Sequence, residues 1–71
     1  MIEIWSKPQC PFCDKAENLC IQKDLEYKKY MLDVDFTRDE FMKKFPTART
    51  FPQILVDGDL VGGYTEFAAT F

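Results

Sequence analysis

Residues 1–13, MIEIWSKPQCPFC, place a short apolar stretch directly before two cysteines, Cys10 and Cys13. Residues 6–8 (SKP) interrupt the apolar stretch, so we expect a strand over 1–6, then a break, then a helix that begins near the cysteines. At that position the helix dipole and the free amide groups of the first turn stabilise a thiolate. Because the two thiols can also close a disulfide, the pair predicts dithiol redox chemistry.

A structural disulfide or a metal site would use the same two cysteines. A cysteine with a pKa of about 8.5 is roughly 3% thiolate at neutral pH, whereas a pKa of about 5.5 makes it almost entirely thiolate. By contrast, a disulfide that closes a loop of about four residues stabilises a fold by only about 2 kcal/mol. Redox function is therefore the favoured interpretation of the pair, with metal binding and a structural disulfide as alternatives.

Composition narrows the class of protein. The 71 residues predict a single domain, 1–71, and seven Phe, three Tyr and one Trp help to fill a small core. No apolar run reaches membrane-spanning length, and no basic-then-apolar leader precedes the first strand, so we expect a soluble domain. Three cysteines are too few for a secreted disulfide framework, which favours a reducing, cytoplasmic location.

The net charge and the absence of histidine argue against nucleic-acid binding and against histidine-dependent chemistry. The formal net charge of −3 and the scattered basic residues argue against nucleic-acid binding. Histidine is absent, which removes Cys–His nucleophile pairs and His-containing zinc sites, so no metal is expected. The chemistry is left to sulfur, carboxylates, lysines and backbone amides.

Periodicity predicts the middle of the chain. Apolar residues recur at helical spacing after Cys13, and residues 25–32 alternate loosely as a second strand. Thr37 and Glu40 have the spacing of a capping box, so a second helix is expected there, ended by Pro46. The side chains expected to be buried in these elements are Ala16, Leu19, Cys20, Tyr27, Tyr30, Leu32, Phe41, Met42 and Phe45.

The last third of the chain reads as a hairpin followed by a helix. Asp57-Gly58 separates two apolar runs, 53–56 and 59–61, while Gly62-Gly63 ends the second run and 65–71 starts a helix. The element order is then β-α-β-α-β-β-α. Strands separated by helices predict parallel pairing, and the hairpin adds an antiparallel edge. We therefore expect an α/β fold with a four-stranded mixed sheet flanked by three helices.

Along essentially its whole length the chain resembles the glutaredoxin branch of the thioredoxin-fold family. Four features occur in the family's order, namely Lys7, the motif at 10–13 (CPFC), residues 50–52 (TFP) and residues 62–66 (GGYTE). The resemblance implies a thioredoxin-like (glutaredoxin) fold and a glutathione-dependent thiol–disulfide oxidoreductase. It makes Cys10 the more exposed nucleophile and Cys13 the resolving thiol. The family usually has Tyr and Val at the positions of Phe12 and Phe51.

The resemblance also implies a glutathione site. A cis Pro52 would expose the main chain of Phe51 to the cysteinyl part of glutathione, and Thr65 would bind the γ-glutamyl carboxylate. Arg49, with Arg38 as a second candidate, would receive the glycyl carboxylate. The residues expected to bind glutathione are Lys7, Phe12, Arg49, Phe51, Pro52, Gly63, Thr65 and Glu66.

Simpler structural roles are the alternatives for several of these residues. Phe12 would instead be a core aromatic, Lys7 a solvated surface lysine, and Thr65 an ordinary helix N-cap. Pro52 would be a trans proline that opens an edge strand. Cys20 is expected to be a small core residue, with regulatory oxidation as the alternative.

The expected co-substrate and partners follow from the same resemblance. The resemblance implies a monomeric enzyme with glutathione as its reducing co-substrate. Its expected substrates are protein disulfides or glutathionylated proteins, with ribonucleotide reductase among the candidates. One alternative is a redoxin that thioredoxin reductase reduces and that donates to ribonucleotide reductase. A second is a binding module that holds a [2Fe–2S] cluster between Cys10 of two chains and two glutathiones.

Overall fold

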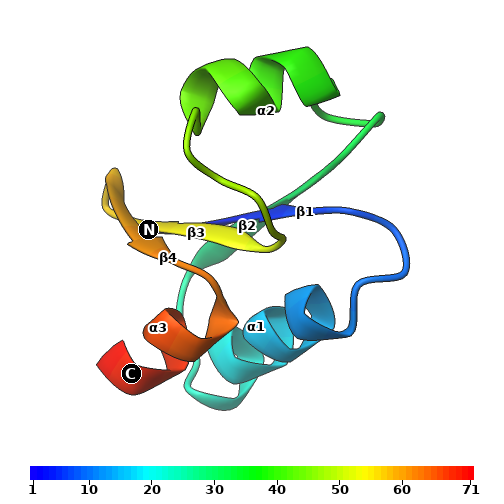
Figure 1. Cartoon of the computed structure of the whole chain (residues 1–71). Helices are drawn as coiled ribbons and strands as arrows, with labels where there is room; N and C mark the ends of the chain where they lie inside the picture. The colour runs from blue at the N-terminus through cyan, green and yellow to red at the C-terminus, as the bar shows by residue number, and fades with distance from the viewer.

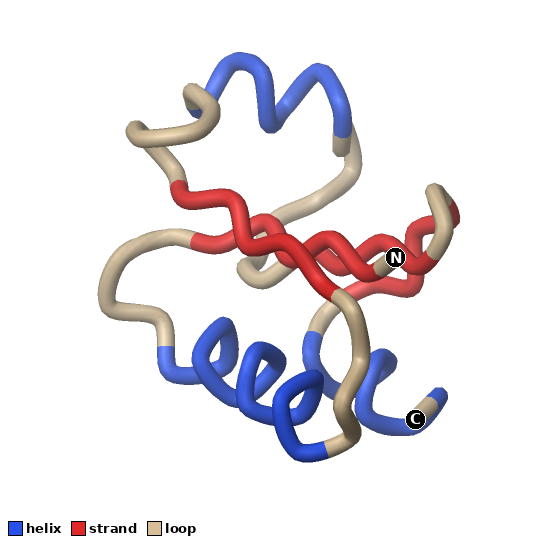
Figure 2. Tube along the Cα trace, turned by 180° about the vertical axis from the view of Figure 1, so that it is seen from behind, coloured by secondary structure: helices blue, strands red, loops and turns tan.

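The computed structural model describes residues 1–71, and its elements occur in the expected order (Figure 1). Figures 1 and 2 show three layers, with α1 and α3 together on one face of the sheet and α2 alone on the other. No helix is both long enough and apolar enough to cross a membrane. The elements are β1 (Ile2–Ser6), α1 (Pro11–Gln22), β2 (Tyr27–Met31), α2 (Arg38–Lys44), β3 (Gln53–Val56), β4 (Asp59–Gly62) and α3 (Tyr64–Thr70).

The sheet is four-stranded and mixed, in the order β2-β1-β3-β4. β1 pairs in parallel with β2, and β3 and β4 form the expected antiparallel hairpin. The expectation of parallel pairing is wrong for β3, which runs antiparallel to β1 with Ile54 opposite Ile4. β1 and β2 end at the same end of the sheet, where Ser6 pairs with Met31. β3 begins at that same end, where Gln53 pairs with Trp5, so it runs back antiparallel to β1.

The core on the α1 and α3 face is built from alternating strand residues. Ile2, Ile4 and Ser6 of β1 are buried, while the residues between them are partly exposed. Cys20 is completely buried, which confirms its expected place in the core, and burial raises the pKa of its thiol. The buried hydrophobic members of this core are Ile2, Ile4, Ala16, Cys20, Ile54 and Phe67.

The core on the α2 face is mainly aromatic, with Phe36, Phe41 and Phe45 packed against Leu55. The expected capping box starts α2, since the Thr37 hydroxyl accepts the Glu40 N–H and the Thr37 N–H donates to the Glu40 carboxylate. Met42 was expected to be buried with Phe41 and Phe45, but its side chain is 45% exposed. One residue advances a helix by about 100°, which turns Met42 from the buried face toward solvent.

Candidate functional site

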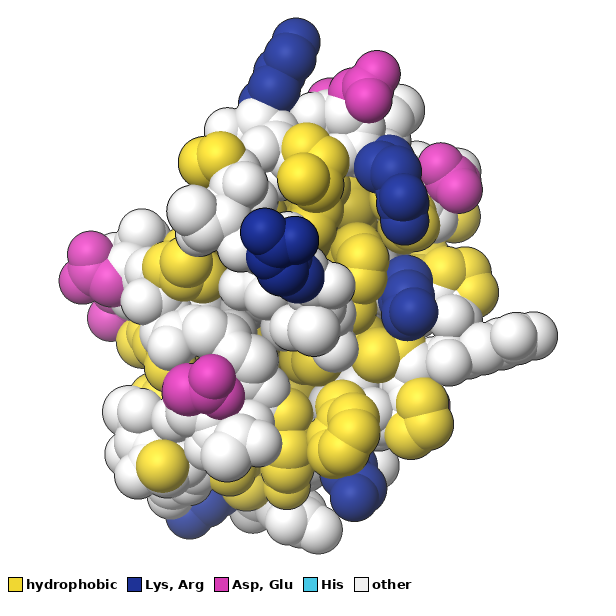
Figure 3. All heavy atoms as spheres, viewed as in Figure 1, with side chains coloured by type: hydrophobic (Ala, Val, Ile, Leu, Met, Phe, Trp, Pro, Cys, Tyr) yellow, Lys and Arg dark blue, Asp and Glu magenta, His cyan; other side chains and the backbone are white.

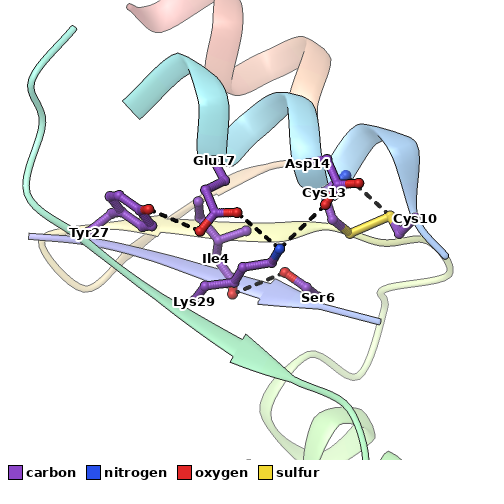
Figure 4. Close-up of polar contacts among 8 residues, drawn as sticks. All are labelled: Ile4, Ser6, Cys10, Cys13, Asp14, Glu17, Tyr27 and Lys29. Atoms are coloured by element: carbon purple, nitrogen blue, oxygen red, sulfur yellow. Dashed lines mark hydrogen bonds and ion pairs between the residues drawn. A yellow bond between two sulfur atoms is a disulfide. The ribbon is translucent and has the colours of Figure 1, made fainter. Parts of the chain in front are cut away.

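Cys10 and Cys13 lie where the β1–α1 loop becomes α1, and their sulfur atoms form a disulfide (Figure 4). The helix starts at the cysteine pair, as the sequence predicted; Cys10 is the N-cap residue of α1, and its sulfur accepts the N–H of Cys13 at 3.2 Å. Pro11, which lacks an N–H, occupies the first helical position. The start of α1 therefore places a backbone donor and the positive end of the helix dipole at the Cys10 sulfur.

The two sulfurs differ in their access to solvent. Cys10 is 7% exposed and lines a surface hollow of about 390 Å³, whereas Cys13 is 1% exposed and does not line this hollow. Cys10 is thus the more open of the two, although most of it is covered in the disulfide form. A substrate sulfur that enters the hollow meets Cys10 before Cys13.

Residues 50–52 form the second part of the site. The Phe51–Pro52 peptide bond is cis, as predicted, and the Gln53 side chain donates to the Thr50 carbonyl at 2.8 Å. The main-chain N–H and C=O of Phe51 have no hydrogen-bond partner within the chain. The Phe51 ring stacks on Phe41 at a centroid distance of 4.5 Å, so the large side chain at this position joins the α2 core.

The third part of the site is the turn between β4 and α3. Gly62 has a φ of +123°, a conformation that favours glycine over other residues. Gly63, and not Thr65, is the N-cap of α3, so the alternative role of Thr65 as an N-cap is wrong. The Thr65 hydroxyl makes no hydrogen bond, and the first three N–H groups of α3 have no acceptor within the chain. These groups remain available to a ligand.

The three parts surround two connected hollows, both of which are lined by Phe12, Arg49, Thr50 and Phe51. All eight residues expected to bind glutathione line one or both of these hollows. The Cys10 hollow is lined by Lys7, Gln9, Cys10, Pro11, Phe12, Arg38, Arg49, Thr50 and Phe51. The long groove, of about 570 Å³, is lined by Phe12, Phe45, Thr47, Ala48, Arg49, Thr50, Phe51, Pro52, Gln53, Leu60, Gly62, Gly63, Tyr64, Thr65 and Glu66.

Phe12 and Lys7 lie at the surface beside the hollows. Phe12 is 52% exposed, so its alternative role as a core aromatic is wrong. The ammonium group of Lys15 lies 5.1 Å from the centroid of the Phe12 ring, and the Tyr64 ring lies 6.0 Å from it, centroid to centroid. Lys7 is exposed, and its ammonium group lies 5.9 Å from the centroid of the Phe51 ring. Both Phe12 and Lys7 are therefore open to a molecule bound at Cys10.

A charged cluster that the sequence analysis did not identify lies beside the dithiol (Figure 4). Lys29 of β2 contacts Glu17 at 3.1 Å and Asp14, the residue after Cys13, at 3.4 Å. The Tyr27 hydroxyl donates to the other Glu17 oxygen at 2.9 Å. Desolvation lowers the pKa of Lys29, but hydrogen bonds and charge from Glu17 and Asp14 outweigh it, so the pKa is raised. The hydrogen bond to Glu17 raises the pKa of Tyr27.

This cluster predicts a loss of stability in alkali. The pKa values are raised because contacts in the folded state stabilise the protonated forms of Tyr27 and Lys29. These contacts contribute fully to folding stability below the ordinary pKa values of 10.0 for Tyr27 and 10.5 for Lys29. The contribution is lost as the pH rises through the pKa values of the folded state. Urea unfolding at about pH 9 and about pH 11 measures the effect. The wild type should lose more stability between these pH values than the double variant Tyr27→Phe/Lys29→Met. An equal loss in the two proteins would contradict this assignment.

The geometry of the site, taken with the fold, defines a class of protein. A four-stranded mixed sheet with three helices carries a cysteine pair at the start of its first helix, and a cis proline follows Phe51, which shares the Cys10 hollow. This combination is that of a thioredoxin-fold thiol–disulfide oxidoreductase. No group of three or more His, Cys, Asp or Glu side chains is arranged to hold a metal ion.

Comparisons with known proteins agree with this class. A glutaredoxin family model matches residues 2–61. Glutaredoxin 3 of Escherichia coli K12 is 31% identical over 68 residues, which cover 96% of this chain and 82% of that protein. The structure of reduced E. coli glutaredoxin has a TM-score of 0.71 at 33% identity and covers 97% of this chain and 89% of its own. A buckwheat glutaredoxin–glutathione complex has the same fold, with a TM-score of 0.84 at 22% identity, and covers 97% of this chain and 66% of its own. The chain belongs to the glutaredoxin family.

Two residues that were not predicted as site residues, Gln53 and Tyr64, also line the long groove. Tyr64 lies within the GGYTE motif, and its position between two glycines and a helix start was the available signal. No local sequence pattern predicts a site role for Gln53. Its side chain belongs to the site because it donates a hydrogen bond to the Thr50 carbonyl.

Proposed function

We propose that this protein is a glutathione-dependent thiol–disulfide oxidoreductase that reduces protein disulfides and glutathione mixed disulfides through Cys10 and Cys13. The observation that carries the proposal is that every residue expected to bind glutathione lines the long groove or the Cys10 hollow. Glutaredoxins use glutathione, and the buckwheat protein of the same fold was solved in complex with it. The low cysteine count supports the reducing cytoplasm as its compartment.

The unpartnered polar groups of the site match the parts of glutathione. The free N–H and C=O of Phe51 pair with the main chain of the cysteinyl residue, as in β-strand addition. The Thr65 hydroxyl and the free N–H groups at the start of α3 receive the γ-glutamyl carboxylate, and Glu66 faces its ammonium group. Arg49 and Lys7 lie beside Cys10 for the glycyl carboxylate.

The reaction proceeds by thiolate exchange. The Cys10 thiolate attacks the glutathione sulfur of a mixed disulfide, and the protein thiol leaves and takes up a proton. A second glutathione thiolate then attacks the Cys10 adduct, which releases glutathione disulfide and restores the Cys10 thiolate. With a protein disulfide, Cys13 instead attacks the mixed disulfide at Cys10. The substrate leaves as a dithiol, and two glutathiones reduce the resulting Cys10–Cys13 disulfide.

Reduction of hydroxyethyl disulfide tests the proposal. The protein is assayed with glutathione and glutathione reductase, and separately with thioredoxin reductase alone, in each case with NADPH. We expect turnover only in the glutathione system, because the groove offers groups for both charged ends of the tripeptide. Turnover only with thioredoxin reductase would overturn glutathione dependence while leaving the Cys10–Cys13 chemistry intact.

A further inference from the structure

The Cys10 hollow continues away from the long groove toward α2. There it joins a second hollow of about 290 Å³, lined by Arg38, Phe41, Met42, Ala48, Arg49 and Phe51. The two hollows share Arg38, Arg49 and Phe51. We name this surface, which runs from Cys10 past Arg49 and Arg38 to Met42, the α2 arm.

The α2 arm is positively charged in an otherwise acidic protein. Lys7, Arg38 and Arg49 line it, all three are exposed, and no Asp or Glu is among its lining residues. None of the three cations forms a salt bridge within the chain, whose formal net charge is −3. Figure 3 shows Lys and Arg side chains interleaved with hydrophobic ones on the half of the molecule that holds α2.

The acidic residues of α2 itself do not neutralise this surface. Glu40 accepts the Thr37 N–H at 2.8 Å in the capping box, so its carboxylate is held at the helix start. Neither Glu40 nor its neighbour Asp39 lines the α2 arm. The cations of the arm therefore lack a carboxylate partner from the protein.

Glutathione supplies too little negative charge to match the arm. In the proposed function, its glycyl end brings one carboxylate to the side of Lys7 and Arg49. Its γ-glutamyl end is a zwitterion at the far end of the long groove, beside Glu66. One carboxylate opposite three cations leaves two cations without a partner. The hydrophobic part of the arm is also unused, since Met42 is 45% exposed beside the buried Phe41.

We propose that the α2 arm binds the segment of a protein disulfide substrate that follows the reacting cysteine, and that it selects segments with two acidic residues and an apolar one. The proposal rests on the proposed function, because the main-chain pairing at Phe51 directs the C-terminal side of a bound cysteine toward Arg49 and Arg38. The acidic side chains meet the cations, and the apolar side chain covers Met42. The ligand is a peptide because it must deliver a sulfur atom to Cys10.

Three synthetic peptides test this selectivity, each carrying one cysteine as a mixed disulfide with 2-thiopyridine. In the first, Glu-Leu-Glu follows the cysteine; in the second, Gln-Leu-Gln follows it; in the third, Glu-Leu-Glu precedes it. The reduced Cys13→Ser protein attacks the peptide sulfur through Cys10 and releases 2-thiopyridone, whose absorbance gives the second-order rate constant. The reaction uses no glutathione, so its outcome is separate from that of the hydroxyethyl disulfide assay.

We expect the first peptide to react about tenfold faster than the second at low ionic strength, as local electrostatic attraction allows. In about 1 M salt, where the Debye length is about 3 Å, the difference should almost vanish. The third peptide directs its acidic residues toward Glu66 and should react no faster than the second. Equal rates for the first two peptides at low ionic strength would overturn the proposal, as would equal rates for the first and third.

Charge variants on α2 locate the effect. Arg38→Gln should lower the rate ratio of the first to the second peptide by about two- to fivefold, the range for one exposed ion pair. Lys43→Gln makes the same charge change on the same helix, but Lys43 does not line the α2 arm, so the ratio should stay unchanged. Because each ratio compares two peptides on one variant, a general change in Cys10 reactivity cancels. An equal decrease in both variants would contradict a site at Arg38.

Discussion

Cys10→Ser is expected to lower turnover of a glutathionylated peptide by at least about a thousandfold, as the loss of a catalytic nucleophile does. Cys13→Ser should stay within about threefold of the wild-type rate, because glutathione alone can resolve the adduct at Cys10. The structural basis is the difference between the two sulfurs. Cys10 caps α1 and lines the hollow, whereas Cys13 is 1% exposed behind it.

Two substrates separate the roles of the cysteines. On a protein with an internal disulfide, Cys13→Ser should be at least about tenfold slower than the wild type, because the resolving step is lost. Cys20→Ala is the control, since this third cysteine is completely buried in the core and should be dispensable for turnover. Equal losses for Cys10→Ser and Cys13→Ser on the glutathionylated peptide would contradict the assigned roles.

Phe67→Ala is expected to cause a large loss of stability. Phe67 is completely buried and is the only buried residue of α3, in the core between that helix, α1 and the sheet. Truncation of a buried Phe to Ala lowers the free energy of unfolding by about 3–5 kcal/mol. For a domain of this length the whole free energy of unfolding is about 4–11 kcal/mol. The variant should therefore be close to unfolding, and the α3 residues Thr65 and Glu66 should lose their place in the long groove.

Urea unfolding measures this effect, with two matched substitutions beside it. Phe67→Leu keeps most of the buried volume and should cost less than about 1.5 kcal/mol. Phe12→Ala removes the same ring from a side chain that is 52% exposed, so it should change stability by no more than about 0.5 kcal/mol. If Phe12→Ala destabilised the protein as much as Phe67→Ala, the proposed core would be wrong.

Local sequence signals were sufficient where a short stretch of chain determines the structure. The capping box at Thr37, the hairpin turn at Asp57-Gly58 and the helix start at Cys10 are each decided by a few neighbouring residues. The direction of β3 depends instead on how far α2 and its flanking loops carry the chain. No local pattern records that distance, so the parallel pairing expected from the element order was wrong for β3.

In the candidate site, too, features set by local motifs were predicted, whereas a feature set by the pairing of distant segments was not. The residues around Cys10, Pro52 and Thr65 were predicted through the motifs that resemble those of glutaredoxins, and the fold brings these motifs to connected hollows. The cluster at Lys29 was missed, because Asp14 and Glu17 look like the solvated face of a helix. Only the parallel register of β1 and β2 places the Lys29 side chain against that face.

The proposed reaction depends on a covalent intermediate between the Cys10 thiolate and glutathione. The most direct measurement incubates reduced Cys13→Ser protein with glutathione disulfide and locates the adduct by mass spectrometry of its peptides. We expect one glutathione per chain, on Cys10, with Cys20 unmodified because it is completely buried. An unmodified Cys10, or an adduct on Cys20 in the folded protein, would contradict it.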